Sequence, residues 1–292
     1  MNKINLHTHS KHSLDGNLDI NEIIKQCLEN NITYISITDH DNCDTYKDLD
    51  LNKTNNKCTL VYGMEADAII DNVTYDILCY GFELDNVSAW AKNQYGTIES
   101  RQRKIYNKLV EECNSLNLKL DDTTPYNSEK EFAHAAIYRM LYETKEGKSF
   151  LEKYNVSNVN DFYRLSTMDK DFPLYIDMNI VWPTIEELSK IIRENKGKLF
   201  LAHPHKYAKG LNVDEILNKC SKYVDGIEIS NEPKNKEEVE YLYEYAKKNN
   251  LLVCAGSDYH TNKDNLNVEY LTEEMENNII KWINEVPGKI EI

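Results

Sequence analysis

Histidine and carboxylate residues stand in short, regularly spaced groups along this chain, and their types point to metal binding. His7 and His9 lie two residues apart near one end, and Asp258 and His260 repeat that spacing near the other. In an extended segment, residues two apart point to the same side, so each pair can reach one ion. Imidazole together with carboxylate suits zinc, manganese or iron, whereas calcium and magnesium prefer oxygen alone. The two pairs therefore predict a divalent-metal site.

Single residues of the same types follow other predicted strands. Asp15 lies in the loop after the first strand, and His40, Glu65 and His203 each stand where a further strand is expected to end. One histidine at a strand end is more often a hydrogen-bonded structural residue, and His12 is interpreted that way because it has no spaced partner. Repeated strand-end positions of this kind are much harder to obtain by chance, so we interpret the set as one metal cluster.

The elements that must hold these residues alternate between strand and helix. Strands are predicted at 4–9, 34–38, 60–68, 73–82, 198–202, 226–230 and 251–255, with a turn at 71–72. Helices are predicted at 20–30, with Asp19 as N-cap, and at 184–195, 213–222, 236–249 and 273–286. This alternation predicts an α/β fold with a parallel sheet, open or closed into a barrel. Such folds place their active sites at the carboxyl ends of the strands.

A helical segment interrupts the alternation. Between residues 87 and 171 no convincing strand is found, and helices are predicted at 98–118, 129–143 and 149–154. We therefore expect two parts. Residues 1–86 and 172–292 form the metal-binding barrel, and residues 87–171 form an inserted helical subdomain that covers the substrate.

The composition of the chain restricts which class of binding partner and which cellular compartment we expect. The net charge is −15, and the one short basic cluster is at 101–104, which disfavours long nucleic acid. A small anionic substrate is still compatible, because bound divalent ions would invert the charge locally. The seven cysteines form no C-x-x-C pair, no apolar run is long enough to span a membrane, and cleaving a leader would remove His7. We expect free buried thiols and a cytoplasmic protein; nothing indicates an oligomeric state.

At these residues the sequence resembles the polymerase-and-histidinol-phosphatase (PHP) superfamily. The resemblance rests on His7 and His9 with Asp15, and on the blocks 38–40, 202–204 and 256–260, and it spans residues 1–85 and 180–262. Segments 182–183 and 225–228 are similar to the stand-alone bacterial branch, which includes nucleotide phosphatases and 5′-to-3′ exonucleases acting on short RNA. The resemblance implies a distorted (β/α)7 barrel with two or three divalent ions, manganese, zinc or iron.

The resemblance also implies a set of metal ligands. The positions that match are His7, His9, Asp15, His40, Glu65, His203, Asp258 and His260. One position departs from the pattern, because Asp76 stands where this branch usually has a histidine before an apolar run. A carboxylate can also ligate or bridge ions, so we expect Asp76 to substitute for that histidine.

A phosphate substrate also needs cationic or polar contacts. His134 stands where the family often has an Arg-x-His pattern, although Phe132 and Ala133 precede it here. Arg101, Arg103 and Arg139 lie in the same helical segment, and His205 follows the ligand His203. We predict substrate contacts for His134, Arg101, Arg103 and His205. The alternatives are a buried structural role for His134, support of the metal ligands by His205, and a solvated helix surface for the arginines.

The expected reaction is hydrolysis of a small phosphate monoester, such as a nucleotide or a nucleoside 3′,5′-bisphosphate. A hydroxide activated by the ions would attack phosphorus in line, with Glu65, Asp258 and His203 as the catalytic set. Three alternatives stay open: a 5′-to-3′ exonuclease on short RNA, a non-catalytic metal-binding module, and an amidohydrolase acting on C–N bonds.

Overall fold

The computed structural model describes residues 3–13, 15–51, 57–128, 130–207, 212–230 and 236–292. The chain divides into two compact units. The barrel unit consists of Met1–Ala68, Tyr75–Ala91 and Ile185–Ile292. The helical unit consists of Ile69–Thr74 and Lys92–Thr184, whereas the sequence predicted an insertion at 87–171.

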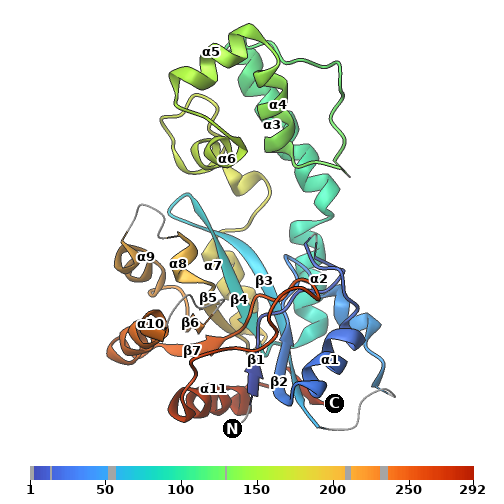
Figure 1. The fold of residues 1–292 in the computed structure, drawn as a ribbon, viewed down its shortest axis with the longest axis vertical. Helices are drawn as coiled ribbons and strands as arrows, with labels where there is room; N and C mark the ends of the chain where they lie inside the picture. Colours follow the sequence, from blue (N-terminus) through green and yellow to red (C-terminus); the bar gives the residue numbers. More distant parts are fainter. Residues whose placement is uncertain (1–2, 14, 52–56, 129, 208–211, 231–235) are drawn as a thin grey trace. The chain divides into compact units, whose positions relative to one another are not determined.

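One mixed sheet forms the centre of the barrel unit (Figure 1). Its strands, in hydrogen-bonded order, are β1 (Lys3–Asn5), β2 (Ile32–Ile37), β3 (Thr59–Ile70), β4 (Val73–Tyr80), β5 (Lys198–Leu201), β6 (Gly226–Ser230) and β7 (Leu252–Ala255). A further strand, β8 (Lys289–Glu291), pairs antiparallel with β3. β1, β2 and β3 are parallel to one another, as are β5, β6 and β7.

The two ends of this strand order are joined by the segments that follow β1 and β7. The backbone N–H of Leu6 donates to the carbonyl of Ala255 at 3.0 Å, and that of His9 donates to the carbonyl of Tyr259 at 2.7 Å. Thr8 and Tyr259 form an isolated parallel bridge. The predicted α/β barrel is therefore confirmed in a distorted form, in which a few hydrogen bonds take the place of a full ladder between the first and last strands.

β4 departs from the expected parallel arrangement, because it pairs antiparallel with β5. The cause is the turn that joins it to β3. Asp71 and Asn72 both have positive φ angles, 48° and 66°, as the tightest hairpin turns require. The sequence indicated this turn. A chain that reverses within two residues must return antiparallel, so no crossover helix separates β3 from β4.

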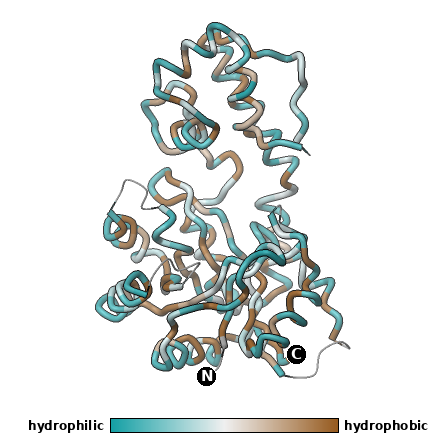
Figure 2. The backbone as a smooth tube through the Cα atoms, in the orientation of Figure 1, coloured by the Kyte–Doolittle hydropathy of each residue, from teal (hydrophilic) through white to brown (hydrophobic). Residues whose placement is uncertain are grey.

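Helices cover the outer face of the sheet. α1 (Ile20–Glu29) packs on β2, α7 (Ile185–Glu194) on β5, α10 (Lys236–Lys248) on β6 and β7, and α11 (Glu273–Glu285) on β7. Asp19 caps α1 as predicted, since its side chain accepts from Asn21 N at 3.0 Å. Figure 2 shows apolar and hydrophilic residues alternating along these helices. That alternation matches helices with one face on a buried sheet.

Several short elements of the barrel unit were not predicted. They are the one-turn helix α8 (Pro204–Tyr207), the 3-10 helix η1 (Asp44–Asp48) and β8, each too short to show a period in the sequence. α9 (Val213–Cys220) was predicted, whereas α2 (Leu84–Tyr95), which runs from the barrel unit into the helical unit, was missed. The seven cysteines are all free and buried, which confirms the expectation of free thiols.

The helical unit is built around four helices: α3 (Ile98–Ser115), α4 (Ala133–Tyr142), α5 (Lys145–Lys153) and α6 (Val159–Met168), followed by the 3-10 helix η3 (Met178–Ile180). α4 packs against the other three. α5 begins earlier than predicted because the Thr144 side chain accepts from Gly147 N at 3.0 Å and caps it. Residue 129, where the sequence placed the start of α4, lies outside the described residues. No helix in the described ranges is long and apolar enough to cross a membrane.

Candidate metal centre

The backbone delivers the predicted ligands from the strands and from the segments that follow them. β1 ends at Asn5, earlier than predicted, but His7 and His9 follow in an extended segment that lies beside Tyr259. The sequence indicated that Glu65 ends its strand, but the structure shows that it does not. It lies inside the twelve-residue β3, which continues past the site into the hairpin with β4, and it forms an isolated parallel bridge with His40.

Four side chains form a central group of donor atoms: His7, His9, Glu65 and Asp258. The Nε2 atoms of His7 and His9 are 3.1 Å apart. Each Nε2 lies 3.1 to 3.2 Å from Oε2 of Glu65 and 3.2 Å from Oδ1 of Asp258. All four residues are buried.

These separations fit a tetrahedral ion. Four ligands about 2.0 to 2.1 Å from a zinc-like ion stand about 3.3 Å from one another, close to the distances in the central group. Without an ion between them, two imidazole nitrogens 3.1 Å apart beside two buried carboxylates would direct lone pairs toward one another. The donor set and its spacing therefore fit a divalent cation between them.

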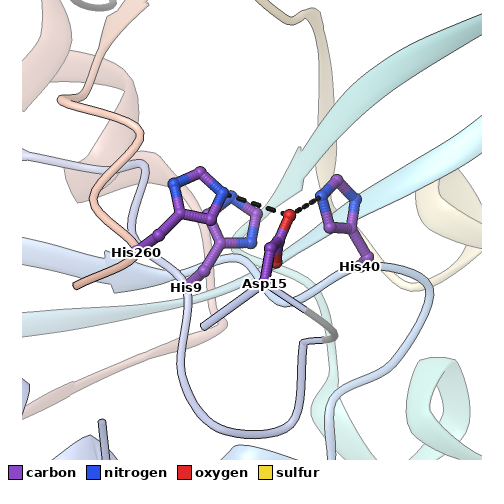
Figure 3. A group of neighbouring side chains, drawn as sticks. All are labelled: His9, Asp15, His40 and His260. Atoms are coloured by element: carbon purple, nitrogen blue, oxygen red, sulfur yellow. Dashed lines mark ion pairs between the residues drawn. The ribbon is translucent and has the colours of Figure 1, made fainter. Parts of the chain in front are cut away.

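A second group lies beside the first and consists of His9, Asp15, His40 and His260 (Figure 3). Oδ2 of Asp15 is 3.4 Å from Nε2 of His40 and 3.3 Å from Nε2 of His260. The rings of His9 and His260 stack with centroids 4.3 Å apart. With three imidazoles and one carboxylate, this outer group can hold an ion of the zinc or iron type.

A third group consists of Glu65, Asp76 and His203. Nε2 of His203 is 3.0 Å from Oε1 of Glu65 and 3.4 Å from Oδ2 of Asp76. The antiparallel course of β4 brings Asp76 to this position, since β4 lies between β3 and β5 in the sheet.

The three groups share residues. His9 belongs to the central and outer groups, and Glu65 to the central and third groups, with its Oε2 facing His7 and its Oε1 facing His203. A carboxylate with its two oxygens directed to two positions can bridge two ions. The structure brings all nine predicted ligands into these three groups.

Glu228, in the middle of β6, orients two of these residues and was given no role from the sequence. Its Oε1 accepts from Nδ1 of His7 at 2.9 Å, and its Oε2 accepts from the backbone N–H of His203 at 2.8 Å. An acceptor on Nδ1 leaves Nε2 free to bind a metal. The available signal was a charged residue inside an otherwise apolar strand, and its side chain is fully buried.

Other partners orient the remaining histidines. Nδ1 of His9 lies 3.1 Å from Oγ of Ser13, which in turn donates to the buried Asp39. Nδ1 of His260 donates to the carbonyl of Asp258 at 2.6 Å. Lys206 forms an ion pair with Oδ2 of Asp258, which leaves Oδ1 facing His7 and His9.

Two site residues carry backbone strain. His203 and Asp258 have φ angles of 28° and 54°, in the left-handed region that residues other than glycine rarely adopt. Strain of this kind costs on the order of 1 to 3 kcal/mol and concentrates at functional sites. The hydrogen bond from His203 N to Glu228 helps to hold one of these two backbone conformations.

The electrostatics of the site favour added positive charge. Burial by itself lowers the pKa of His7, but Glu65, Glu228 and Asp258 outweigh it and raise that pKa well above its usual range. Burial by itself raises the pKa of Glu65, but His7 and His40 hold it well below its usual range. The raised pKa of His7 favours its protonated form in the absence of a metal, and that proton partly balances the carboxylates. A divalent ion could take the place of this proton.

The residues predicted to contact the substrate do not belong to the three groups of ligands. Three of them lie in the helical unit. His134 is buried, with its ring 5.0 Å from that of Tyr163, and burial lowers its pKa to about 4. Arg101 donates from Nη1 to the carbonyl of Tyr95 at 3.0 Å. On the surface of α3, Arg103 pairs with Glu99 at 2.9 Å.

Two further cationic or polar candidates have different surroundings. Arg139, also in the helical unit, pairs with Glu131 at 2.7 Å. His205 lies in α8 of the barrel unit, two residues after His203, and its Nε2 has no hydrogen-bond partner among the described residues. His205 is thus two residues from the ligand His203 in the sequence, whereas the ionic contacts of Arg103 and Arg139 are internal to the helical unit.

The arrangement can be compared with known proteins. Over 96% of both chains, the fold is similar to a protein from Bifidobacterium adolescentis provisionally named as a metal-dependent phosphoesterase (TM-score 0.60, 18% identity). It is also similar to an amidohydrolase from Chromobacterium violaceum with bound sulfate and no metal (TM-score 0.61, 18% identity, 94% of this chain and 96% of that one). At this identity the likeness concerns the fold alone. No curated protein matches the chain.

A match to a family pattern is more direct evidence of family membership than these fold similarities. The PHP domain pattern matches residues 5–200, which is more than half of the chain and includes His7, His9, Asp15, His40, Glu65 and Asp76. Together with a distorted α/β barrel that gathers histidines and carboxylates at one place, this match shows that the chain belongs to the PHP domain family.

Proposed function

We propose that this protein is a metal-dependent phosphoesterase that hydrolyses a small phosphate monoester, of the nucleotide or nucleoside 3′,5′-bisphosphate class. The observation that carries the proposal is that three groups of donor atoms share His9 and Glu65. Ions held in adjoining groups would be close enough to act on one phosphoryl group. Two or three ions of manganese, zinc or iron suit these mixed donors.

The ions, when bound, would lower the pKa of a coordinated water and neutralise charge on the phosphoryl oxygens. The residues of the chain fix where this happens. Glu65 presents one oxygen to each of two groups, and Asp258 presents Oδ1 to the central group while Lys206 occupies its Oδ2. His203 faces the second oxygen of Glu65. We therefore assign the positioning of the reacting atoms to Glu65, Asp258 and His203.

A cysteine nucleophile is not needed in this proposal. Cys43, near the outer group in sequence, is buried with its Sγ 3.9 Å from Sδ of Met64. Burial raises the pKa of the Cys43 thiol, which keeps it protonated and a poor nucleophile.

The partner we propose is a small phosphorylated molecule. The net charge of −15 opposes a long polyanion, whereas a compact substrate would meet chiefly the ions. His205 is a candidate contact because its Nε2 lacks a partner among the described residues. Contacts from His134, Arg101 and Arg103 remain predictions. The free cysteines accord with a cytoplasmic protein, which we also propose.

Hydrolysis of a C–N bond is a second candidate. The observation in its favour is the fold similarity to a protein named as an amidohydrolase. Ions that stabilise a phosphoryl oxygen can also polarise a carbonyl, so the donor groups alone do not separate the two reactions. The motif order of the chain favours the phosphoesterase.

The test is a substrate screen on protein of known metal content. The substrates would be AMP, a nucleoside 3′,5′-bisphosphate, histidinol phosphate, a 5′-phosphorylated dinucleotide and a set of simple amides. His9→Ala removes a residue shared by two groups. The matched control is His12→Ala, because His12 pairs with Asp48 at 2.9 Å and belongs to none of the three groups.

The outcomes separate the candidates. Phosphate release that is lost in His9→Ala and kept in His12→Ala supports the proposal. Cleavage of an amide alone would favour the second candidate, and cleavage of the dinucleotide alone would favour an exonuclease. Tight binding of ions without turnover of any substrate would instead indicate a non-catalytic metal-binding module and refute the proposal.

A further inference from the structure

The three donor groups are not chemically equivalent. The outer group offers three imidazoles, and the central group offers two imidazoles and two carboxylates. The third group offers two carboxylates and a single imidazole, from Glu65, Asp76 and His203. Oxygen-rich sites favour hard ions such as Mn²⁺ and Mg²⁺, whereas imidazole-rich sites favour zinc and iron.

The imidazole of the third group also lacks an orienting contact that three of the other imidazoles have. Nδ1 of His7 has Glu228 as its acceptor, that of His9 has Ser13, and that of His260 has a backbone carbonyl. Nδ1 of His203 is buried and has no hydrogen-bond partner among the described residues. A metal-binding histidine normally gains basicity and a fixed orientation from such a partner.

Tyr207 of α8 is a neighbour that holds the backbone of Asp76. The Tyr207 hydroxyl accepts from the backbone N–H of Asp76 at 2.7 Å. The same ring lies 5.5 Å from that of His203 and 5.0 Å from that of Tyr75. The Asp76 side chain is 27% exposed against 1% for Glu65, but exposure does not separate this group from the outer one, where Asp15 is 46% exposed.

From these three observations we propose that the Glu65–Asp76–His203 group is a weaker, exchangeable cation site that prefers an oxygen-seeking ion such as Mn²⁺, and that Tyr207 is its positioning residue. The central and outer groups hold their ions more tightly. The inference rests on the metal centre used by the proposed function, and it is independent of which ester is cleaved.

The size of the effect follows from the contacts. Loss of a partner that orients a metal ligand typically weakens metal binding by about 10- to 100-fold. His203 lacks such a partner, and its site has one donor fewer than the central group. We therefore expect the third ion to bind at least about 10-fold more weakly than the other two.

The experiment counts ions and does not require turnover. Full-length protein is saturated with Mn²⁺ and dialysed exhaustively, and the retained metal is measured by mass spectrometry. We expect two retained ions per chain, one for each of the tight groups, and a third only when Mn²⁺ is titrated back by calorimetry. Mg²⁺ should compete with Mn²⁺ for this third position, because the carboxylate oxygens of the third group suit Mg²⁺.

Three variants assign the weak position. Asp76→Ala should remove the third binding event and leave two retained ions, whereas Asp76→His should make a third Zn²⁺ resistant to dialysis. Tyr207→Phe should weaken the third event by roughly 10-fold. Its matched control is Tyr46→Phe. The Tyr46 hydroxyl also accepts from a backbone N–H, that of Gly63, and donates to a backbone carbonyl, but it is hydrogen-bonded to none of the nine ligands of the three groups.

The proposal is overturned if wild-type protein retains any number of ions other than two, if Asp76→Ala titrates like wild type, or if Tyr207→Phe and Tyr46→Phe bind the third ion equally. Failure of the proposed function is distinguishable from these results. Protein that shows the expected ion counts but cleaves no ester would refute the phosphoesterase alone.

Discussion

Glu228→Gln is the substitution that most directly tests how the metal centre is held. Each oxygen of Glu228 accepts one hydrogen bond, from Nδ1 of His7 and from the backbone N–H of His203. A glutamine of the same shape keeps one acceptor oxygen and replaces the other with an amide that can only donate. One of the two buried donors, on His7 or on His203, must then lose its partner.

Two consequences can be given a magnitude. A buried donor left without an acceptor costs about 1 to 3 kcal/mol, which should lower the stability of the protein by that amount. Loss of the acceptor on Nδ1 of His7, or of the bond that holds strained His203, should weaken metal binding by about 10- to 100-fold. Both ligands remain present, so the number of binding sites should not change.

The assay is competition for Zn²⁺ against a chelator of known affinity, together with thermal unfolding of the metal-free protein. Glu276→Gln is the control, because Glu276 is a buried glutamate of α11 that belongs to none of the three groups. It should leave metal affinity unchanged. Wild-type affinity in Glu228→Gln would refute the idea that Glu228 orients the metal ligands.

Three further predictions follow from the same geometry. His9→Ala, which removes a residue shared by two groups, should lose more bound metal than His7→Ala, as metal analysis would show. Gly256→Ala should lower the melting temperature and metal content, because its Cβ would stand 2.1 Å from Cβ of His7. The third concerns pH. Since the pKa of folded His7 is raised above 6.5, the stability it gives metal-free protein is complete below that pH and is lost as pH rises through the raised value. Metal binding requires deprotonated ligands, so the stabilisation of the protein by added Mn²⁺ should increase as the pH rises through the same range. The measurement is the melting temperature as a function of pH, with and without Mn²⁺. A constant difference between the two melting temperatures across this pH range would contradict the prediction.

The strand ends were predictable from the sequence because the relevant physics is local. A strand of a parallel sheet delivers whatever follows it to one edge, so His7, His9, His203 and Asp258 could be expected to meet once their strands were identified. The turn at Asp71 and Asn72 was also visible. The turn also implies that β4 runs opposite to β3, but the pairing of β4 with β5 is not contained in the periodicity.

The partners of the ligands could not be obtained in that way. Glu228 reaches His7 across 221 positions of sequence, and Tyr207 reaches Asp76 across 131. A glutamate or tyrosine within an apolar run has many possible partners, and only the packed fold selects one. The short elements α8 and β8 were missed for a related reason, since three or four residues are too few to show a period.

The way the barrel is joined has a consequence for folding. The same two segments that link the first and last strands carry ligands of the central group, and beside them Asn5 donates to Ser257, 252 residues away along the chain. An ion bound there acts as a cross-link between the two ends of the chain. In the chain-entropy description, closing a loop of that length costs the chain about 5 kcal/mol, which folding must supply before the ligands of this ion can meet. The ligands cannot meet until both ends of the barrel are made, so metal capture should be a late event in folding, and metal loss should open the barrel first at this junction.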